Sequence, residues 1–173
     1  IRPLKATLGA EVLNCDLDEI TPAESAPLVE ALHQHGVLVL RGQQCSPDAQ
    51  VRFAELFGPI EVPVVKEYLL PEQPKILVLS NIVRDGRPIG ATDAGQWWHV
   101  DMSYKDPPAR CTFLHAIQIP FDERGQALGD TMFSNVAVAY EALPQRAKSE
   151  LEGLSAVHSH AWRYAQVVAE SAG

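Results

Sequence analysis

Two helix starts of the same design flank a short apolar run near the beginning of the chain and define its first structural elements. Residues 21–24 (Thr-Pro-Ala-Glu) form a capping box with proline at the first helical position, and an apolar stripe carries the predicted helix to Gly36. Residues 46–47 (Ser-Pro) repeat this start, and residues 58–59 (Gly-Pro) end the second helix. The run between the two helices, residues 37–40, is too short for a helix and favours a buried strand.

The remainder of the chain alternates short apolar runs with proline- and glycine-bearing connections. β-Branched and aromatic residues favour strands in such runs, whereas segments without a hydrophobic period predict loops. We therefore expect a mostly β body with flanking helices, an α+β chain. Strands are predicted at residues 8–13, 76–79 and 111–119, loops at 60–75 and 84–95, and helices at 135–143 and 144–151.

Composition excludes several classes of protein. The 173 residues carry 14 basic and 22 acidic side chains, a formal net charge of −8, and no basic cluster, which argues against nucleic acid or an anionic membrane as a partner. No apolar run approaches the length of a membrane span, and no signal-peptide pattern is present. The three cysteines are odd in number and form no C-x-x-C, which predicts reduced thiols in a cytoplasmic protein. The length suits a single domain.

The stretch of residues 97–104 (Trp-Trp-His-Val-Asp-Met-Ser-Tyr) carries the most specific chemistry. It suits a strand edge or a strand running into a loop, and residues two apart on a strand point to the same face. His99 and Asp101 would then project side by side, as two of the three ligands in a facial triad for ferrous iron. An isolated H-x-D is more commonly a surface histidine beside a capping aspartate, and the pattern alone leaves this interpretation open.

Five motifs in order resemble the taurine dioxygenase/2,4-D dioxygenase (TauD/TfdA-like) family of Fe(II)- and 2-oxoglutarate-dependent oxygenases. The resemblance covers nearly the whole chain, and it implies a double-stranded β-helix, the jelly roll of cupin-like proteins. The motifs are G-V-L-V-L-R-G at 36–42, F-G-P at 57–59, W-H-V-D-M-S at 98–103, G-D-T-M-F at 129–133 and A-Y-E-A-L-P at 139–144.

The resemblance also implies an activity and a set of site residues. His99 and Asp101 match the family's first two iron ligands, and Thr131 matches the threonine that helps to hold the distal carboxylate of 2-oxoglutarate. The reaction consumes O2, decarboxylates 2-oxoglutarate to succinate and hydroxylates the substrate. One departure lies beside this motif, because Leu128 stands where relatives commonly have a second glycine.

A larger departure concerns the family's distal histidine ligand and the arginine that anchors 2-oxoglutarate, which both lie on late strands. His158, His160 and Arg163 precede those strands in the family's order, so we assign none of them to these roles. We therefore expect residues 1–173 to be the N-terminal portion of a longer single jelly-roll domain, with the C-terminal part of the fold outside this chain.

Relatives act on small organic anions, which predicts an anionic substrate held by a cation. Lys66 is best placed for this role by resemblance, although a solvated surface lysine is an equal alternative. The family's taurine enzymes carry a histidine in the loop that here contains Lys66. No histidine lies between His35 and His99 in this chain, so taurine is a less favoured substrate. Other predicted pocket residues are Tyr68, Asn81, Gln96 and Trp97.

The resemblance further implies a homo-oligomer, a dimer or tetramer. A jelly roll that binds a metal or ligand without turnover is the alternative function.

Overall fold

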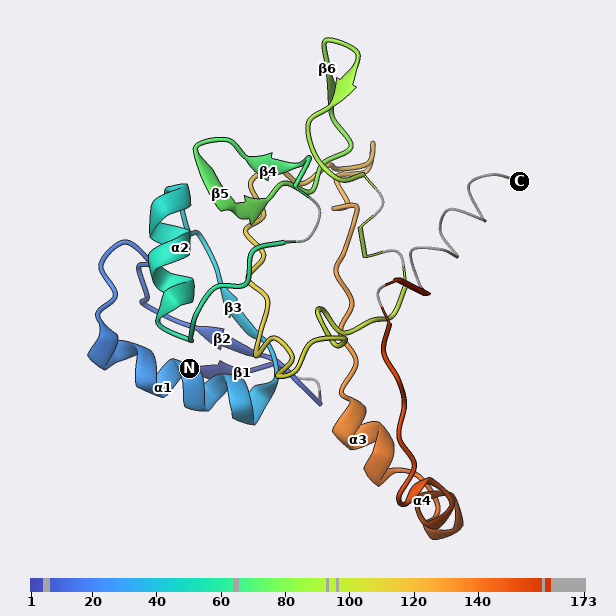
Figure 1. The fold of residues 1–173 in the computed structure, drawn as a ribbon. Coiled ribbons are helices and arrows are strands. Elements are labelled where there is room, and N and C mark those ends of the chain that lie inside the picture. Colours follow the sequence, from blue (N-terminus) through green and yellow to red (C-terminus); the bar gives the residue numbers. More distant parts are fainter. Residues whose placement is uncertain (5–6, 64–65, 93, 96, 160, 163–173) are drawn as a thin grey trace. The chain divides into compact units, whose positions relative to one another are not determined.

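A computed structural model describes residues 1–4, 7–63, 66–92, 94–95, 97–159 and 161–162 (Figure 1). The chain divides into two compact units, and each is described by itself. The first unit comprises Ile1–Ala94 and Phe113–Ala142, and the second comprises Gly95–Thr112 and Leu143–Gly173.

A three-stranded sheet opens the first unit. Its strands β1 (Arg2–Pro3), β2 (Ala10–Val12) and β3 (Leu38–Leu40) lie in the order β1-β2-β3. β1 is antiparallel to β2, whereas β2 and β3 are parallel and are connected through α1 (Pro22–His35). α1 packs against this sheet (Figure 1). The strands predicted at residues 8–13 and 37–40 are therefore confirmed as β2 and β3, with shorter bounds. β3 is half-buried, whereas a buried strand is predicted there.

Helix α1 begins and ends where its local signals predict. The Glu24 carboxylate accepts hydrogen bonds from the Thr21 N–H at 2.9 Å and from the Thr21 hydroxyl at 2.6 Å. Gly36 ends the helix at a φ of 71°, a left-handed conformation that glycine adopts without strain, and its N–H donates to the Leu32 carbonyl at 2.8 Å. Leu28 and Ala31 form the buried face of the helix.

Helix α2 (Pro47–Glu55) supplies the main aromatic core. The Ser46 hydroxyl accepts the N–H of Ala49 at 3.2 Å, which confirms the predicted cap. Phe53 and Phe57 are 4% and 5% exposed, and together with Phe113 they form an edge-to-face cluster. The ring centroids are 5.3 Å apart for Phe53–Phe57, 5.6 Å for Phe53–Phe113 and 5.1 Å for Phe57–Phe113.

Two antiparallel pairs lie where loops were predicted. β4 (Leu69–Leu70) pairs with β5 (Gln73–Leu77). β4 therefore lies inside the loop predicted at residues 60–75, and the strand predicted at 76–79 begins at Gln73. β6 (Val83–Arg84) pairs with β7 (Arg87–Pro88) across the turn residues Asp85 and Gly86. These have φ values of 50° and 76°, and a two-residue hairpin turn of this kind favours Asp-Gly.

The predicted strands at residues 97–104 and 111–119 are wrong. Within the described ranges, neither segment belongs to a strand. A strand requires a neighbour for its backbone hydrogen bonds, and no strand among the described residues pairs with either segment. The side chain of Phe113 packs in the aromatic cluster.

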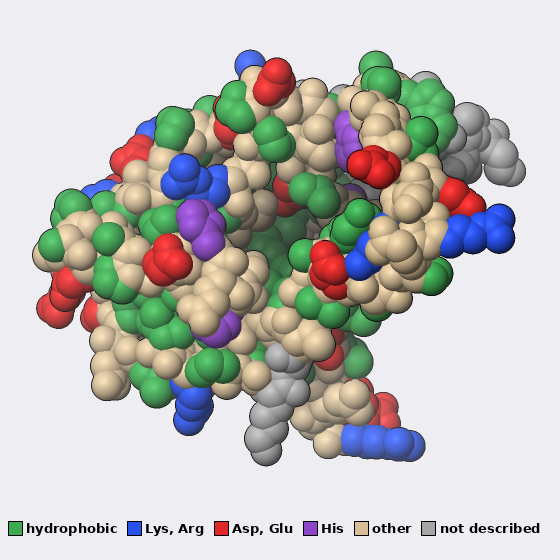
Figure 2. All heavy atoms as spheres, turned by 90° about the horizontal axis from the view of Figure 1, so that it is seen from below, with side chains coloured by type: hydrophobic (Ala, Val, Ile, Leu, Met, Phe, Trp, Pro, Cys, Tyr) green, Lys and Arg blue, Asp and Glu red, His purple; other side chains and the backbone are tan. Residues whose placement is uncertain are grey.

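Two of the predicted helices, at residues 135–143 and 144–151, are confirmed with slightly shorter bounds. α3 (Val136–Glu141) is capped by Asn135, whose side chain accepts the N–H of Val138 at 3.1 Å, and α4 (Gln145–Leu151) follows it. Large apolar side chains are exposed in the second half of the chain, including Ile117 at 88% and Met132 at 73%, and Figure 2 shows hydrophobic side chains on the molecular surface. Among the described residues, no helix is both long enough and apolar enough to span a membrane.

Candidate metal centre

His99 and Asp101 lie together in an irregular segment of the second unit. Residues 98–100 have no regular structure, and residues 101–104 form a turn in which Met102 has a φ of 52°. The two side chains still converge, with 3.0 Å between His99 Nε2 and Asp101 Oδ1. The predicted pair is thus present, although a turn and not a strand brings it together.

A backbone carbonyl determines which nitrogen of His99 is available. His99 Nδ1 lies 2.6 Å from the carbonyl oxygen of Trp97. A carbonyl oxygen can only accept, so Nδ1 carries the proton and donates it. A neutral ring with its proton on Nδ1 presents the lone pair of Nε2 toward the Asp101 carboxylate, which is the tautomer that can bind a metal through Nε2, whereas a protonated ring donates from Nε2 to that carboxylate.

The carboxylate of Asp101 is also held by a hydrogen bond. The Thr112 hydroxyl donates to Asp101 Oδ2 at 2.7 Å, while Asp101 Oδ1 faces His99. A neutral Nε2 and an anionic oxygen at this separation repel each other unless a cation binds both, whereas a protonated ring donates from Nε2 to Oδ1 directly as an ion pair. The arrangement therefore suits either a bound cation or a His–Asp ion pair.

The separation of the two donor atoms fits a first-row divalent metal. Nitrogen and oxygen ligands lie about 2.1 Å from such ions, and two ligands at a right angle are then about 3.0 Å apart. The observed 3.0 Å matches this value, and the side chains of His99 and Asp101 are 52% and 48% exposed, so both remain accessible. Among the described residues, no group of three or more His, Cys, Asp or Glu side chains lies close enough together to hold a metal. His99 and Asp101 could therefore supply two ligands.

The other predicted site residues are divided between the two units. Trp97 is in the second unit, where its carbonyl holds His99 and its side chain is 68% exposed. Gln96 lies outside the described residues. The first unit contains Lys66 and Asn81, which are exposed, half-buried Tyr68, and Thr131, which is exposed in the segment before α3.

Two contacts near the pair were not predicted from the sequence. One is the bond from Thr112 to Asp101, and the other joins His158 Nδ1 to Ser103 Oγ at 2.8 Å within the second unit. The only local signal for Thr112 was a hydroxyl in the apolar run Cys-Thr-Phe-Leu.

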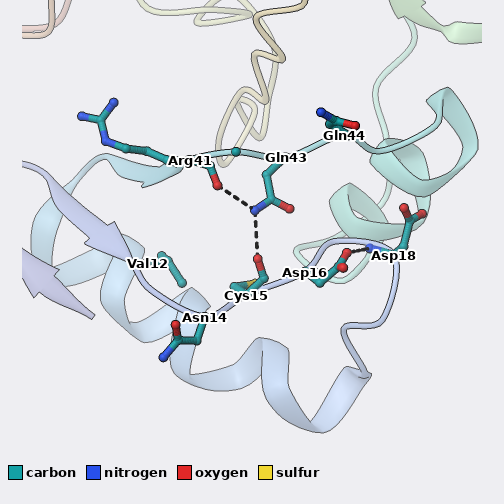
Figure 3. A pocket seen from close by; sticks show the side chains of 9 residues that line it. Val12, Asn14, Cys15, Asp16, Asp18, Arg41, Gln43 and Gln44 are labelled. Atoms are coloured by element: carbon teal, nitrogen blue, oxygen red, sulfur yellow. Dashed lines mark hydrogen bonds between the residues drawn. The ribbon is translucent and has the colours of Figure 1, made fainter.

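A separate pocket lies in the first unit, between the loops that follow β2 and β3 (Figure 3). Its volume is about 440 Å³, its lining is mostly polar, and it contains none of the predicted site residues. Gln43 joins the two loops, because its amide donates to the carbonyls of Cys15 at 2.9 Å and Arg41 at 3.1 Å and accepts the N–H of Leu17 at 3.1 Å. Burial, and to a lesser degree the nearby Asp16, raises the pKa of the Cys15 thiol, so this cysteine is protonated near neutral pH. These contacts hold the two loops together, which indicates a structural role for the residues around this pocket.

The fold resembles that of one solved structure. The crystal structure of AAD-2 in complex with Mn(II) and N-oxalylglycine superposes with a TM-score of 0.56 and 24% sequence identity, over 87% of this chain and 53% of that chain. This likeness concerns the fold alone.

Sequence comparison then identifies the family. Residues 1–171 match the taurine catabolism dioxygenase TauD, TfdA family, and the chain belongs to it. This confirms the family predicted from the five motifs. Its α-ketoglutarate-dependent dioxygenases are oxidoreductases that use Fe(II) and 2-oxoglutarate.

Three relatives illustrate the range of the family. The chain is 36% identical to the alpha-ketoglutarate-dependent 2,4-dichlorophenoxyacetate dioxygenase of Cupriavidus pinatubonensis, over 90% of this chain and 56% of the relative. It is 33% identical to the pentalenolactone F synthase of Streptomyces avermitilis, over 95% and 54%. It is 34% identical to the alkylsulfatase of Acinetobacter baylyi, over 95% and 48%. The chain thus spans about half the length of the curated relatives it matches.

Proposed function

We propose that the protein is an Fe(II)- and 2-oxoglutarate-dependent dioxygenase that hydroxylates a small organic anion. The observation that carries this proposal is the convergence of His99 Nε2 and Asp101 Oδ1 at 3.0 Å, with Nδ1 of the ring held by the Trp97 carbonyl. The names of the relatives support the substrate class, since phenoxyacetates, phenoxypropionates and sulfate esters are all organic anions.

We propose further that residues 1–173 form the N-terminal portion of one jelly-roll domain. The relatives are almost twice as long as the matched region, which leaves room for the third metal ligand and for an arginine that binds 2-oxoglutarate. The same remainder would supply strands that pair with residues 111–119 and cover the exposed apolar side chains. A dimeric or tetrameric assembly stays a prediction.

Each named residue has a distinct part in the proposed reaction. The metal with 2-oxoglutarate supplies the activation of O2 when bound. The His99 ring is kept in place by its bond to the Trp97 carbonyl, and Asp101 contributes a negative charge and one oxygen. The Thr131 hydroxyl would donate to the distal carboxylate of 2-oxoglutarate, and the ammonium group of Lys66 would attract the substrate anion. Overall, O2, 2-oxoglutarate and a substrate C–H bond give succinate, CO2 and an alcohol.

Tyr68, Asn81, Gln96 and Trp97 are proposed to line the substrate pocket. The indole of Trp97 presents exposed apolar surface two residues before the ligand His99. Apolar surface of this kind suits the alkyl or aryl portion of an organic anion.

The alternative is a jelly roll that binds a metal or ligand without turnover. One observation favours it, namely that no cluster of three metal-ligating side chains is found among the described residues. The two functions are distinguished by turnover, because only the enzyme decarboxylates 2-oxoglutarate.

The test is an anaerobic titration of the complete protein with Fe(II) and 2-oxoglutarate, followed by admission of O2. We expect a visible charge-transfer band and formation of succinate in the wild type. His99→Ala should abolish both, whereas His33→Ala, an exposed histidine at the end of α1, should leave both unchanged. A band without succinate for any organic anion would favour the non-catalytic alternative. Retention of the full band in His99→Ala would contradict the ligand assignment.

A further inference from the structure

We infer that Thr112 is a positioning residue for the metal centre, which it serves by orienting the carboxylate of Asp101. The inference rests on the proposed function, because it concerns how a ligand of the proposed metal is held. Its observation is the 2.7 Å hydrogen bond from Thr112 Oγ1 to Asp101 Oδ2, within the second unit.

The backbone around Asp101 does not fix its side chain. The residue lies in a turn, is followed by Met102 at a φ of 52°, and has a side chain that is 48% exposed. An exposed carboxylate on a turn is free to change its rotamer and to rotate about its last bond. Hydrogen bonds must therefore hold the carboxylate where it faces His99.

The two ligands are held in analogous ways. His99 is fixed by the Trp97 carbonyl at the nitrogen that faces away from the pair, and Asp101 is fixed by Thr112 at the oxygen that faces away from it. Partners of this kind, which touch a ligand and not the metal, set the ligand's orientation and its affinity for metal. Thr112 is the residue that does this for Asp101.

The hydrogen bond also selects which oxygen remains available. A carboxylate with two free oxygens can bind an ion through one oxygen or through both. Thr112 uses one acceptor position of Oδ2 and so disfavours a metal bond from that oxygen, while Oδ1 faces His99 Nε2 at 3.0 Å. Binding through one oxygen keeps a coordination position open, and facial-triad chemistry needs open positions for its co-substrates.

The test compares four forms of the complete protein: wild type, Thr112→Val, Thr112→Ser and Asp101→Ala. Valine keeps the shape of threonine without the hydroxyl, whereas serine keeps the hydroxyl without the methyl group. Mn(II) affinity is measured by the EPR signal of the free ion, and the absorption maximum of the anaerobic Fe(II)–2-oxoglutarate complex is recorded. Circular dichroism without metal verifies the fold, and the exposed position of Thr112 makes the substitutions compatible with folding.

We expect Thr112→Val to weaken Mn(II) binding by about ten- to a hundredfold, the usual effect of losing such a partner, and to shift the absorption maximum. Thr112→Ser should restore both, and Asp101→Ala should abolish binding. Wild-type affinity and absorption in Thr112→Val would overturn the inference, as would equal losses in the valine and serine variants. If wild type and Asp101→Ala fail alike to bind Mn(II), the proposed metal site is itself refuted.

Discussion

Replacing Phe53 by alanine should produce a large loss of stability, because this ring lies at the centre of the aromatic core. Phe53 is 4% exposed and has ring neighbours at 5.3 Å in Phe57 and 5.6 Å in Phe113. Phe53 belongs to α2, while Phe113 opens the segment in which the predicted strand did not form. The substitution therefore tests whether the side chain of Phe113 anchors that segment.

The expected magnitude follows from burial and ring geometry. Truncating a buried phenylalanine to alanine costs about 3–5 kcal/mol. A chain of this size loses about 2–4 °C of melting temperature per kcal/mol, so the shift should be about 6–20 °C. Phe53→Leu keeps most of the volume and loses two edge-to-face pairs worth about 0.5–1.5 kcal/mol each, so it should cost about 1–3 kcal/mol.

The assay is urea unfolding followed by far-ultraviolet circular dichroism, with a double-mutant cycle on Phe53→Leu and Phe113→Leu. Residues in contact should show a coupling energy of about 0.5–1.5 kcal/mol. Phe121→Leu is the matched control, because Phe121 is 64% exposed and should change stability by no more than about 0.5 kcal/mol. A coupling energy near zero, or a loss in Phe53→Ala no larger than that of the control, would refute the packing argument.

Three further predictions concern other residues. Gln43→Ala removes three hydrogen bonds, two of which join the loops after β2 and β3, and should lower the free energy of unfolding by about 1–3 kcal/mol; unchanged urea midpoints would contradict this. The hydrogen bond from Arg2 to Glu11 lowers the pKa of that carboxyl, so its stabilisation is present at neutral pH and is lost as pH falls through the folded pKa. The wild type should therefore lose stability below about pH 4.5 more steeply than Glu11→Gln, and parallel pH curves would exclude the effect. Lys66→Ala should raise KM for the anionic substrate more than KM for 2-oxoglutarate, and an unchanged substrate KM would remove Lys66 from the proposed site.

The helices could be predicted because their signals are local. A threonine or serine cap followed by proline determines where α1 and α2 begin, and Gly36 ends α1 in a conformation that suits glycine. None of these interactions requires a distant partner. The capping residue Asn135 acts in the same way at the start of α3.

The strands were harder to predict because each depends on a partner elsewhere in the chain. Residues 111–119 have strand-like composition, yet composition states only that a strand is possible, and Phe113 contributes its side chain to an aromatic cluster. Residues 69–70 and 73–75 form strands where a loop is predicted, since Pro71 and Pro74 indicate a loop although both are compatible with a short antiparallel pair. The Asp-Gly turn between β6 and β7 was a usable signal for a hairpin.

For the candidate site, the sequence predicted the donor pair but not what holds it. The H-x-D spacing was interpreted through a strand, whereas the structure brings His99 and Asp101 together in a turn. The bond from Thr112 and the contact between His158 and Ser103 join residues far apart in sequence, so neither could be deduced from local spacing.

The β6–β7 hairpin has a practical consequence for handling the protein. Residues 81–88 are all exposed, and the turn at Asp85 and Gly86 lies between the two strands. Exposed loop tips are the preferred sites of proteolytic nicking and of tolerated insertions. Trypsin should therefore cut first after Arg84, whereas the proline that follows Arg87 protects the next arginyl bond. The same turn is a suitable position for a fluorescent label or an inserted affinity tag, because nothing in the aromatic core or the His99–Asp101 pair lies within it.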